Sequence, residues 1–335
     1  MLLTIMCNKA DHARVRSTGQ GSTGQACRVA ALALLLLVAG CAGNGANSAT
    51  DAATGAGTDA SGSQGVAGSG GLVVVASFYP LQWLTAQVGG DAVAVSSLTE
   101  PGVEPHDLEL TPQDVATVGQ ADLVVFLSGF QPAVDEVAGQ QAEDTAFDVA
   151  EGARLTLTRE GGEIDPHFWL DPMRLADVGD LLARRLGEID PEGAATFTAN
   201  AQAVRAQLAA LDRELTDGLA SCANRDLVTS HDAFGYLADA YDLRQVGITG
   251  LSPEAEPSPG ELSAVTEFVR ANEVATIYFE TLVSPDIAET VARETGAQTQ
   301  VLDPLEGLTD AAQGEDYLAV MRSNLANLKT GQSCP

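Results

Sequence analysis

The sequence predicts an α/β protein in which two lobes with mainly parallel sheets are joined by one long, rigid helix. From residue 72 onward, short β-branched runs alternate with longer segments of helical period, which is typical of α/β folds. Continuous apolar runs such as Leu-Val-Val-Val-Ala indicate parallel strands that are covered on both faces. A long helical period in the middle of the chain divides this pattern into two halves of similar size.

Residues 1–40 are predicted to be an export signal of the lipoprotein type. Basic residues precede an apolar run of about ten residues, which is shorter than the roughly 20 that span a membrane. Val-Ala-Gly-Cys at 38–41 is similar to a bacterial lipobox, so Cys41 is the expected lipid anchor; a plain signal peptide with a chance cysteine is the alternative. Residues 41–71 are almost wholly small or polar and are expected to form a flexible tether. Together they predict a folded body outside the cell membrane, lipid-anchored to its outer face.

An N-terminal α/β lobe is expected over residues 72–190 and a C-terminal α/β lobe over residues 222–335. The first contains the strand candidates Leu72–Ser77, Val93–Leu98 and Asp122–Leu127 and a helix candidate at Pro112–Gly119. The second contains the strand candidates Asp226–Thr229, Val274–Phe279 and Thr299–Leu302 and a helix that opens with Ser-Pro, Ser284–Thr295.

Residues 191–221 are expected to form the helix that links the lobes. Its apolar residues recur at steps of three and four, which predicts one amphipathic helix of nearly thirty residues, about 45 Å long. They are Phe197, Ala201, Val204, Leu208, Leu211, Leu215 and Leu219. Such a helix would be a stiff spine between the lobes; an ordinary long surface helix of a single domain is the alternative.

Charge and hydropathy exclude two classes of function. The chain carries a net charge of −29, and residues 1–40 hold four of its basic residues but only one acidic residue. A surface this acidic excludes binding to nucleic acid through a basic patch. No segment after residue 72 is long and apolar enough to cross a membrane, so this chain is not itself the transport channel.

Cys222 and Cys334 are expected to form a disulfide, because export would place them in an oxidising compartment. The bond would tie the end of the chain to its middle. Two free thiols or thiolate metal ligands are the alternatives, although no Cys-x-x-Cys spacing supports the latter.

Three histidines remain after the predicted signal, and each lies in a short polar segment beside an apolar run. They are His106 in Glu-Pro-His-Asp, His167 in Asp-Pro-His-Phe-Trp and His231 in Ser-His-Asp. Imidazole is the commonest metal ligand in proteins, so this pattern suggests a metal site. The alternative is three unrelated surface or capping histidines.

The predicted strands bring more polar residues to the same place. Ligands of open α/β sheets collect beyond the carboxyl ends of the strands, where His106, His231, Glu280 and Asp303 are expected to lie. Asp303 is a candidate fourth metal ligand, or it caps a turn before Pro304. Glu280 is expected to hydrogen-bond a ligating imidazole rather than the metal.

A family resemblance connects these segments. Six segments follow one another along the chain in this order: Ala-Ser-Phe-Tyr-Pro-Leu (76–81), Pro-His-Asp-Leu-Glu-Leu-Thr-Pro-Gln-Asp (105–114), Asp-Pro-His-Phe-Trp-Leu-Asp-Pro (165–172), Thr-Ser-His-Asp-Ala-Phe-Gly-Tyr (229–236), Glu-Pro-Ser-Pro (256–259) and Val-Leu-Asp-Pro-Leu (301–305). The chain resembles the zinc and manganese substrate-binding proteins of ABC uptake systems, the ZnuA/TroA-like group, which includes proteins of the cell adhesion family.

The resemblance implies two lobes with a single metal ion in the cleft, held by His106, His167, His231 and Asp303. Manganese-type members usually carry Glu where this chain has His231, and nitrogen-rich ligation favours Zn²⁺ over Mn²⁺. Many zinc-specific members also have a histidine-rich loop, whereas residues 132–163 contain no histidine here. The auxiliary metal-collecting role of that loop is therefore not expected.

We expect a monomeric, extracytoplasmic zinc-binding lipoprotein that delivers Zn²⁺ to an ABC permease and is not an enzyme. A manganese-binding protein of the same class is the alternative. A surface adhesin and an extracytoplasmic zinc hydrolase are further alternatives. Glu280 could serve as the base of a hydrolase, but no His-Glu-x-x-His motif is present.

Overall fold

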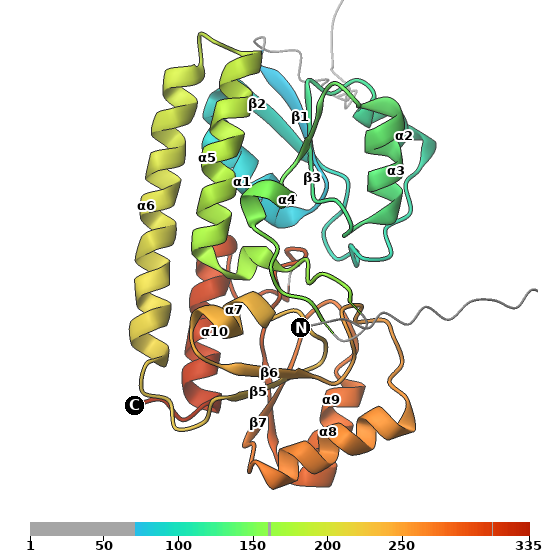
Figure 1. Cartoon of the computed structure of the whole chain (residues 1–335), viewed down its shortest axis with the longest axis vertical. Helices are drawn as coiled ribbons and strands as arrows, with labels where there is room; N and C mark the ends of the chain where they lie inside the picture. Colours follow the sequence, from blue (N-terminus) through green and yellow to red (C-terminus); the bar gives the residue numbers. More distant parts are fainter. Residues whose placement is uncertain (1–70, 160–161, 310) are drawn as a thin grey trace, which may run out of the picture. The chain divides into compact units, whose positions relative to one another are not determined.

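The computed structural model describes residues 71–159, 162–309 and 311–335, which contain two four-stranded parallel sheets (Figure 1). The expected signal peptide, the anchor Cys41 and the expected tether up to residue 70 lie outside these residues. Among the described residues, no helix combines the length and the apolar composition needed to cross a bilayer.

The first sheet has the strand order β2-β1-β3-β4, and its neighbours are all parallel. Its elements run β1 (Leu72–Ala76), α1 (Tyr79–Gly89), a 3₁₀ turn (Gly90–Ala92), β2 (Val93–Ser97), α2 (Pro112–Val118), β3 (Leu123–Phe126), α3 (Pro132–Gln141), β4 (Ala146–Asp148) and α4 (Ala150–Ala153). In the register, Val74 lies opposite Val95 on one side and Leu123 on the other.

Alternating side chains of β1 and β3 pack on opposite faces of this sheet. Val75 and Val124 contact the apolar side chains of α2 and α3, while Val74 and Val125 belong to the core shared with α1 and α5 (Pro172–Ile189). Because successive strand residues point to opposite faces, a run such as Val-Val-Val can be buried throughout only when both faces are covered. Helices cover both faces of the sheet, as the apolar runs predicted (Figure 1).

The second sheet has the order β6-β5-β7-β8 and is also parallel. Its elements are β5 (Asp226–Thr229), α7 (Gly235–Ala240), β6 (Arg244–Gly247), α8 (Pro259–Ala271), β7 (Thr276–Phe279), α9 (Asp286–Thr295), β8 (Gln298–Val301) and α10 (Tyr317–Gly331). Val228 and Ile277 pack toward α8 and α9, and Leu227 and Tyr278 pack on the opposite face. Each of the two sheets is therefore packed against other elements on both of its faces.

The long helix is α6 (Ala194–Leu219), 26 residues, which packs against α1, α5 and α10. All seven apolar residues of the predicted stripe are buried. Polar contacts join the same helices: Arg205 pairs with Asp177 and Asp180 of α5, and Arg322 of α10 pairs with Glu214. The helix thus contacts helices of both halves, as a stiff spine requires.

The predicted strands are present to within one or two residues at each end, and the α/β fold is confirmed. Helix α9 begins two residues after the predicted start, where the Ser284 hydroxyl accepts a hydrogen bond from the Asp286 amide at 3.3 Å. Strands β4 and β6 were not predicted. The exact lobe boundaries 72–190, 191–221 and 222–335 stay a prediction.

The expected disulfide is present between Cys222 and Cys334, 112 residues apart in the chain. It follows α6 directly and joins the last residues of the chain to the start of β5. Backbone hydrogen bonds from Ala223 to Ser333 and from Asn224 to Gln332 hold the same junction.

Candidate metal centre

Three imidazoles and one carboxylate converge on one point. The ligand atoms of His106, His167, His231 and Glu306 all lie within 4.8 Å of one another. His106 lies in the loop after β2, His167 before α5, His231 directly after β5 and Glu306 in the loop after β8. Two side chains thus come from each half of the chain, three of them beyond the carboxyl ends of strands.

The spacing of these atoms fits a tetrahedral metal ion. Glu306 Oε1 lies 2.9 Å from His167 Nε2, 3.2 Å from His231 Nε2 and 3.4 Å from His106 Nε2. The Nε2 atoms of His106 and His167 are 3.4 Å apart. Tetrahedral bonds of about 2.0–2.1 Å place donor atoms about 3.3–3.4 Å from one another. Four of the six donor separations are therefore already close to those that a bound Zn²⁺ would set.

The second oxygen of Glu306 supports the same interpretation. Glu306 is fully buried, and its Oε2 atom has no hydrogen-bond partner among the described residues. A buried carboxylate oxygen without a partner is costly unless a cation compensates it. A divalent ion at the centre would supply that compensation.

Asp165 orients His167 from behind. Its Oδ1 accepts a hydrogen bond from the His167 amide at 3.0 Å and lies 2.8 Å from His167 Nδ1. A carboxylate at Nδ1 fixes the proton there and leaves the Nε2 lone pair free for a metal. Both side chains are fully buried, so water does not compete for this contact.

Glu280 does the same for His231. Its Oε1 lies 2.7 Å from His231 Nδ1 and accepts a hydrogen bond from the Ser230 hydroxyl at 2.6 Å. The expected contact between Glu280 and a candidate ligand is therefore what the structure contains. The role of base in a hydrolase would require Glu280 to face the metal side of the imidazole, and it faces the other side.

Asp303 does not join the four converging groups. Its Oδ1 accepts from the Leu305 amide at 2.8 Å, and its Oδ2 accepts from the Thr281 hydroxyl at 3.1 Å. Leu305 has φ 60°, a left-handed backbone that a non-glycine residue rarely adopts. The Asp303 side chain stabilises this turn, and the turn presents Glu306 to the imidazoles. These contacts are those of the turn cap that the sequence analysis gave as the alternative role of Asp303.

Glu306 was not predicted as a ligand from the sequence. The residue follows Asp303 by only three positions, in the same loop beyond the same strand. Because an Asp before Pro is a strong turn signal, Asp303 could have been assigned to the turn. Glu306, the next acidic residue of the loop, would then have been the candidate ligand. Asn324 of α10 holds the loop by bonding both the amide and the carbonyl of Asp303, at 2.9 and 2.7 Å.

His106 lies at the accessible side of the site. Its side chain is 11% exposed, whereas those of His167, His231 and Glu306 are completely buried. Phe130 packs edge-on against the imidazole with ring centroids 4.7 Å apart. His106 is therefore the first of the four groups that an entering ion would meet.

Charges within the site shift its pKa values strongly. Burial alone would raise the pKa of Glu306, but the His231 charge and the imidazole hydrogen bonds outweigh it and hold that pKa well below its usual range. Burial alone would lower the pKa of His231, but Glu280 and Glu306 outweigh it and hold that pKa well above 6.5. Burial would likewise lower the pKa of His167, and Asp165 and Glu306 outweigh it and raise it. The raised pKa values of His167 and His231 mean that a metal ion must compete with protons for these two imidazoles.

A family comparison decides the classification. The model of the family described as zinc-uptake complex component A, periplasmic, matches residues 74–331. The chain belongs to this family. The match includes both sheets and all four converging side chains, so the resemblance seen in the sequence is confirmed.

Individual members of the zinc-uptake family are similar over most of the chain. The zinc-binding lipoprotein AdcA of Streptococcus pneumoniae is 38% identical over 280 residues, which cover 78% of this chain and 56% of AdcA. The chain thus spans about half the length of that relative. The high-affinity zinc uptake system protein ZnuA of Bacillus subtilis is 34% identical over 276 residues, covering 77% of this chain and 86% of ZnuA.

A solved structure in the family has the same fold. The laminin-binding protein Lmb of Streptococcus agalactiae, described as a bifunctional protein with adhesin and metal transporting activity, is similar with a TM-score of 0.72 at 34% identity. The alignment covers 78% of this chain and all of Lmb.

Proposed function

We propose that this protein binds Zn²⁺ outside the cytoplasmic membrane and delivers it to an ABC permease. His106, His167, His231 and Glu306 would hold the ion. The observation that carries the proposal is the convergence of three Nε2 atoms on one buried carboxylate, at separations of 2.9–3.4 Å. Relatives in the zinc-uptake family support the choice of cargo and of partner.

The donor set favours zinc over manganese. Three neutral imidazoles and one carboxylate offer three nitrogens and at least one oxygen, whereas Mn²⁺ favours more oxygen ligands. Zn²⁺ with Glu306 leaves a net charge of +1, and the carboxylates of Asp165 and Glu280 behind two imidazoles compensate it. Four protein donors close a tetrahedral site and leave no position for a catalytic water, which argues for binding rather than hydrolysis.

The lipid anchor and the tether belong to the same proposal. Cys41 would carry the lipid, residues 41–71 would form the tether, and the folded part would act as a monomer at the outer face of the cell membrane. The name lipoprotein given to the Streptococcus pneumoniae relative supports an anchored, extracytoplasmic location. Metabolic labelling with palmitate in cells expressing the wild type or Cys41→Ala would test the anchor.

Competitive titration of the metal-free protein with Zn²⁺ and Mn²⁺ tests the cargo. We expect tight one-to-one binding of Zn²⁺ and affinity for Mn²⁺ that is lower by at least about a hundred-fold, because imidazole suits zinc better. Equal affinity for the two metals would contradict zinc as the cargo. Binding of several zinc ions without a break at one equivalent would contradict a single centre.

As the pH is lowered, zinc affinity should begin to decrease at a pH above the pKa of free imidazole. The pKa values of His167 and His231 are raised, so their protons compete with zinc already above pH 6.5. Each imidazolium that must lose its proton should cost about ten-fold in affinity per pH unit. Competition titrations between about pH 8 and about pH 6 measure this slope, and a flat profile across that range would contradict it.

The same shifts predict the opposite trend for the stability of the metal-free protein. A raised imidazole pKa stabilises the fold fully below the unfolded value near 6.5, and this contribution disappears as the pH rises through the folded pKa. The lowered pKa of Glu306 contributes above its unfolded value near 4.5 and loses this contribution only in stronger acid. Thermal midpoints should therefore decrease above neutral pH without zinc, and added zinc should restore them.

A surface adhesin is the second candidate, favoured by the description of the Streptococcus agalactiae relative. The variant His231→Ala distinguishes zinc delivery from adhesion. Uptake of radioactive zinc by cells should be lost in this variant if delivery is the function, because one ligand is missing. Adherence to a laminin-coated surface should be unchanged if adhesion is the function, since His231 is buried.

A further inference from the structure

Arg159 lies beside the loop that carries His167. An antiparallel bridge joins Thr158 to Ile164, and the Arg159 amide donates to the Glu163 carbonyl at 2.8 Å. This pairing sets the Arg159 side chain next to Asp165, the carboxylate that orients His167. Arg159 hydrogen-bonds none of the four groups that would hold the metal.

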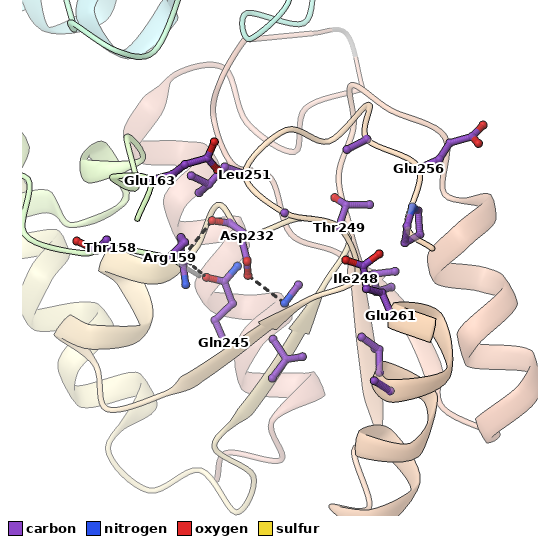
Figure 2. Close-up of a pocket in the computed structure, with 17 residues that line it drawn as sticks. Thr158, Arg159, Glu163, Asp232, Gln245, Ile248, Thr249, Leu251, Glu256 and Glu261 are labelled. Carbon is purple, nitrogen blue, oxygen red and sulfur yellow. Dashed lines mark hydrogen bonds between the residues drawn. The ribbon is translucent and has the colours of Figure 1, made fainter. Parts of the chain in front are cut away.

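One nitrogen of Arg159 lies within hydrogen-bond distance of acceptors from three segments. Its Nη2 is 2.6 Å from Asp165 Oδ2, 3.1 Å from the Asp232 carbonyl and 3.0 Å from Gln245 Oε1. Figure 2 shows the last two contacts, with Arg159 between the loop after β5 and the side chain from β6. The guanidinium is therefore a junction between the segment before α5 and the second sheet.

Each of these contacts leads to a candidate zinc ligand. Asp165 bonds the amide and contacts Nδ1 of His167 through its other oxygen. Gln245 donates from Nε2 to the His231 carbonyl at 3.1 Å. Asp232 is the residue that follows His231. One side chain thus connects Asp165, which contacts the His167 imidazole, with groups that hold the backbone at His231, and these two histidines come from opposite halves of the chain.

Gly235 shows how tightly this junction is packed. A Cβ atom at Gly235 would collide with both Arg159 Nη2 and Asp165 Oδ2. The start of α7 therefore presses on the ion pair, and glycine allows the approach. Arg159 also lines a cavity of about 680 Å³, together with Asp232 and Gln245 (Figure 2).

We propose that Arg159 is a positioning residue that sets the orientation of His167 and His231 relative to each other before zinc arrives. The inference rests on the proposed zinc-binding function. Orientation of this kind matters because a metal ion needs all its ligands at fixed directions at once, and loss of an outer hydrogen-bond partner typically costs about 10–100-fold in metal affinity. Gln245 transmits the contact to His231, and Asp165 transmits it to His167.

Arg159→Gln in the full chain tests the proposal. We expect zinc affinity to decrease about 10–100-fold and zinc transfer to a chelator to accelerate. Co²⁺ bound in place of zinc reports the ligand directions through its visible absorption, and we expect the bands of the variant to shift and weaken. Arg159→Lys keeps the charge beside Asp165 but loses the planar fork, so it should give an intermediate affinity.

Arg225→Gln is the matched control. Arg225 also donates to three carbonyl groups, those of Leu219, Ala220 and Tyr241, but it lies at the end of β5 opposite His231. We expect it to lower the thermal midpoint while zinc affinity and the Co²⁺ spectrum stay at wild-type values. An unchanged affinity and spectrum in Arg159→Gln, or equal losses in Arg225→Gln, would overturn the positioning role. If the wild type itself binds no zinc, the proposed function fails instead.

Discussion

Replacing Glu306 by glutamine is expected to weaken zinc binding by about a hundred- to a thousand-fold. Structural zinc sites contribute about 10–16 kcal/mol in total, so one of four ligands accounts for about 3–4 kcal/mol, and each 1.4 kcal/mol is about ten-fold. The amide keeps the size of the side chain but removes the charge that faces all three imidazoles. The remaining site would hold a buried Zn²⁺ with three neutral ligands and a net charge of +2.

Asp303→Asn is the matched comparison, because it makes the same chemical change three residues earlier in the same loop. The amide oxygen of the substituted side chain can still accept from the Leu305 amide, so the turn that presents Glu306 should persist. We expect zinc affinity to fall by less than the roughly 10–100-fold that loss of an outer hydrogen-bond partner costs, because the bond to the Leu305 amide is kept.

Titration of both variants with Zn²⁺ against a competing chelator measures the difference. Thermal unfolding of the two metal-free proteins provides the control for folding. A large loss of affinity in Asp303→Asn together with a small loss in Glu306→Gln would reverse the assignment and restore Asp303 as the ligand that the family resemblance implied.

The fold was predictable because its interior strands are continuous apolar runs. Leu-Val-Val-Val-Ala and Leu-Val-Val-Phe contain no polar residue, and such runs are typical of strands covered on both faces. The two strands that were missed, β4 and β6, are edge strands with one neighbour each. β6 reads Arg-Gln-Val-Gly and β4 has three residues, so neither carries an apolar run.

The convergence of the three histidines was predictable from the sequence, whereas that of Glu306 was not. His231 closely follows β5 and His106 lies in the loop after β2, so both were expected beyond the carboxyl ends of strands. The choice between Asp303 and Glu306 depends on how a loop turns. Here it depends on the left-handed backbone at Leu305 and on the contacts of Asn324, which is distant in sequence.

The network around Arg159 was not predictable for a similar reason. Its three acceptors come from residues 165, 232 and 245, and two of these belong to the other half of the chain. No spacing within the sequence encodes these contacts. Only the packing of α7 against the segment before α5 brings them together.

Removing the disulfide by Cys222→Ala with Cys334→Ala is expected to lower stability by about 4–5 kcal/mol at most, because the bond closes a loop of about a hundred residues in the unfolded chain. For a chain of this size that corresponds to a thermal midpoint lower by about 10 °C. The native junction should survive, since Gln332 still donates to the Asp226 carbonyl at 2.9 Å and Cys334 lies on a segment already bonded to residues 223 and 224.

Zinc affinity should therefore stay within about two-fold of the wild type. Removing the bond acts mainly by increasing the entropy of the unfolded chain, and the four converging groups are unchanged. Calorimetry of the double variant and of the reduced wild type should give the same midpoint, which separates the missing bond from the missing side chains. A midpoint unchanged by both treatments would show that the hydrogen bonds at the junction alone hold the end of the chain. A parallel loss of zinc affinity would show instead that the disulfide shapes the metal centre through α10, whose Asn324 holds the loop that presents Glu306.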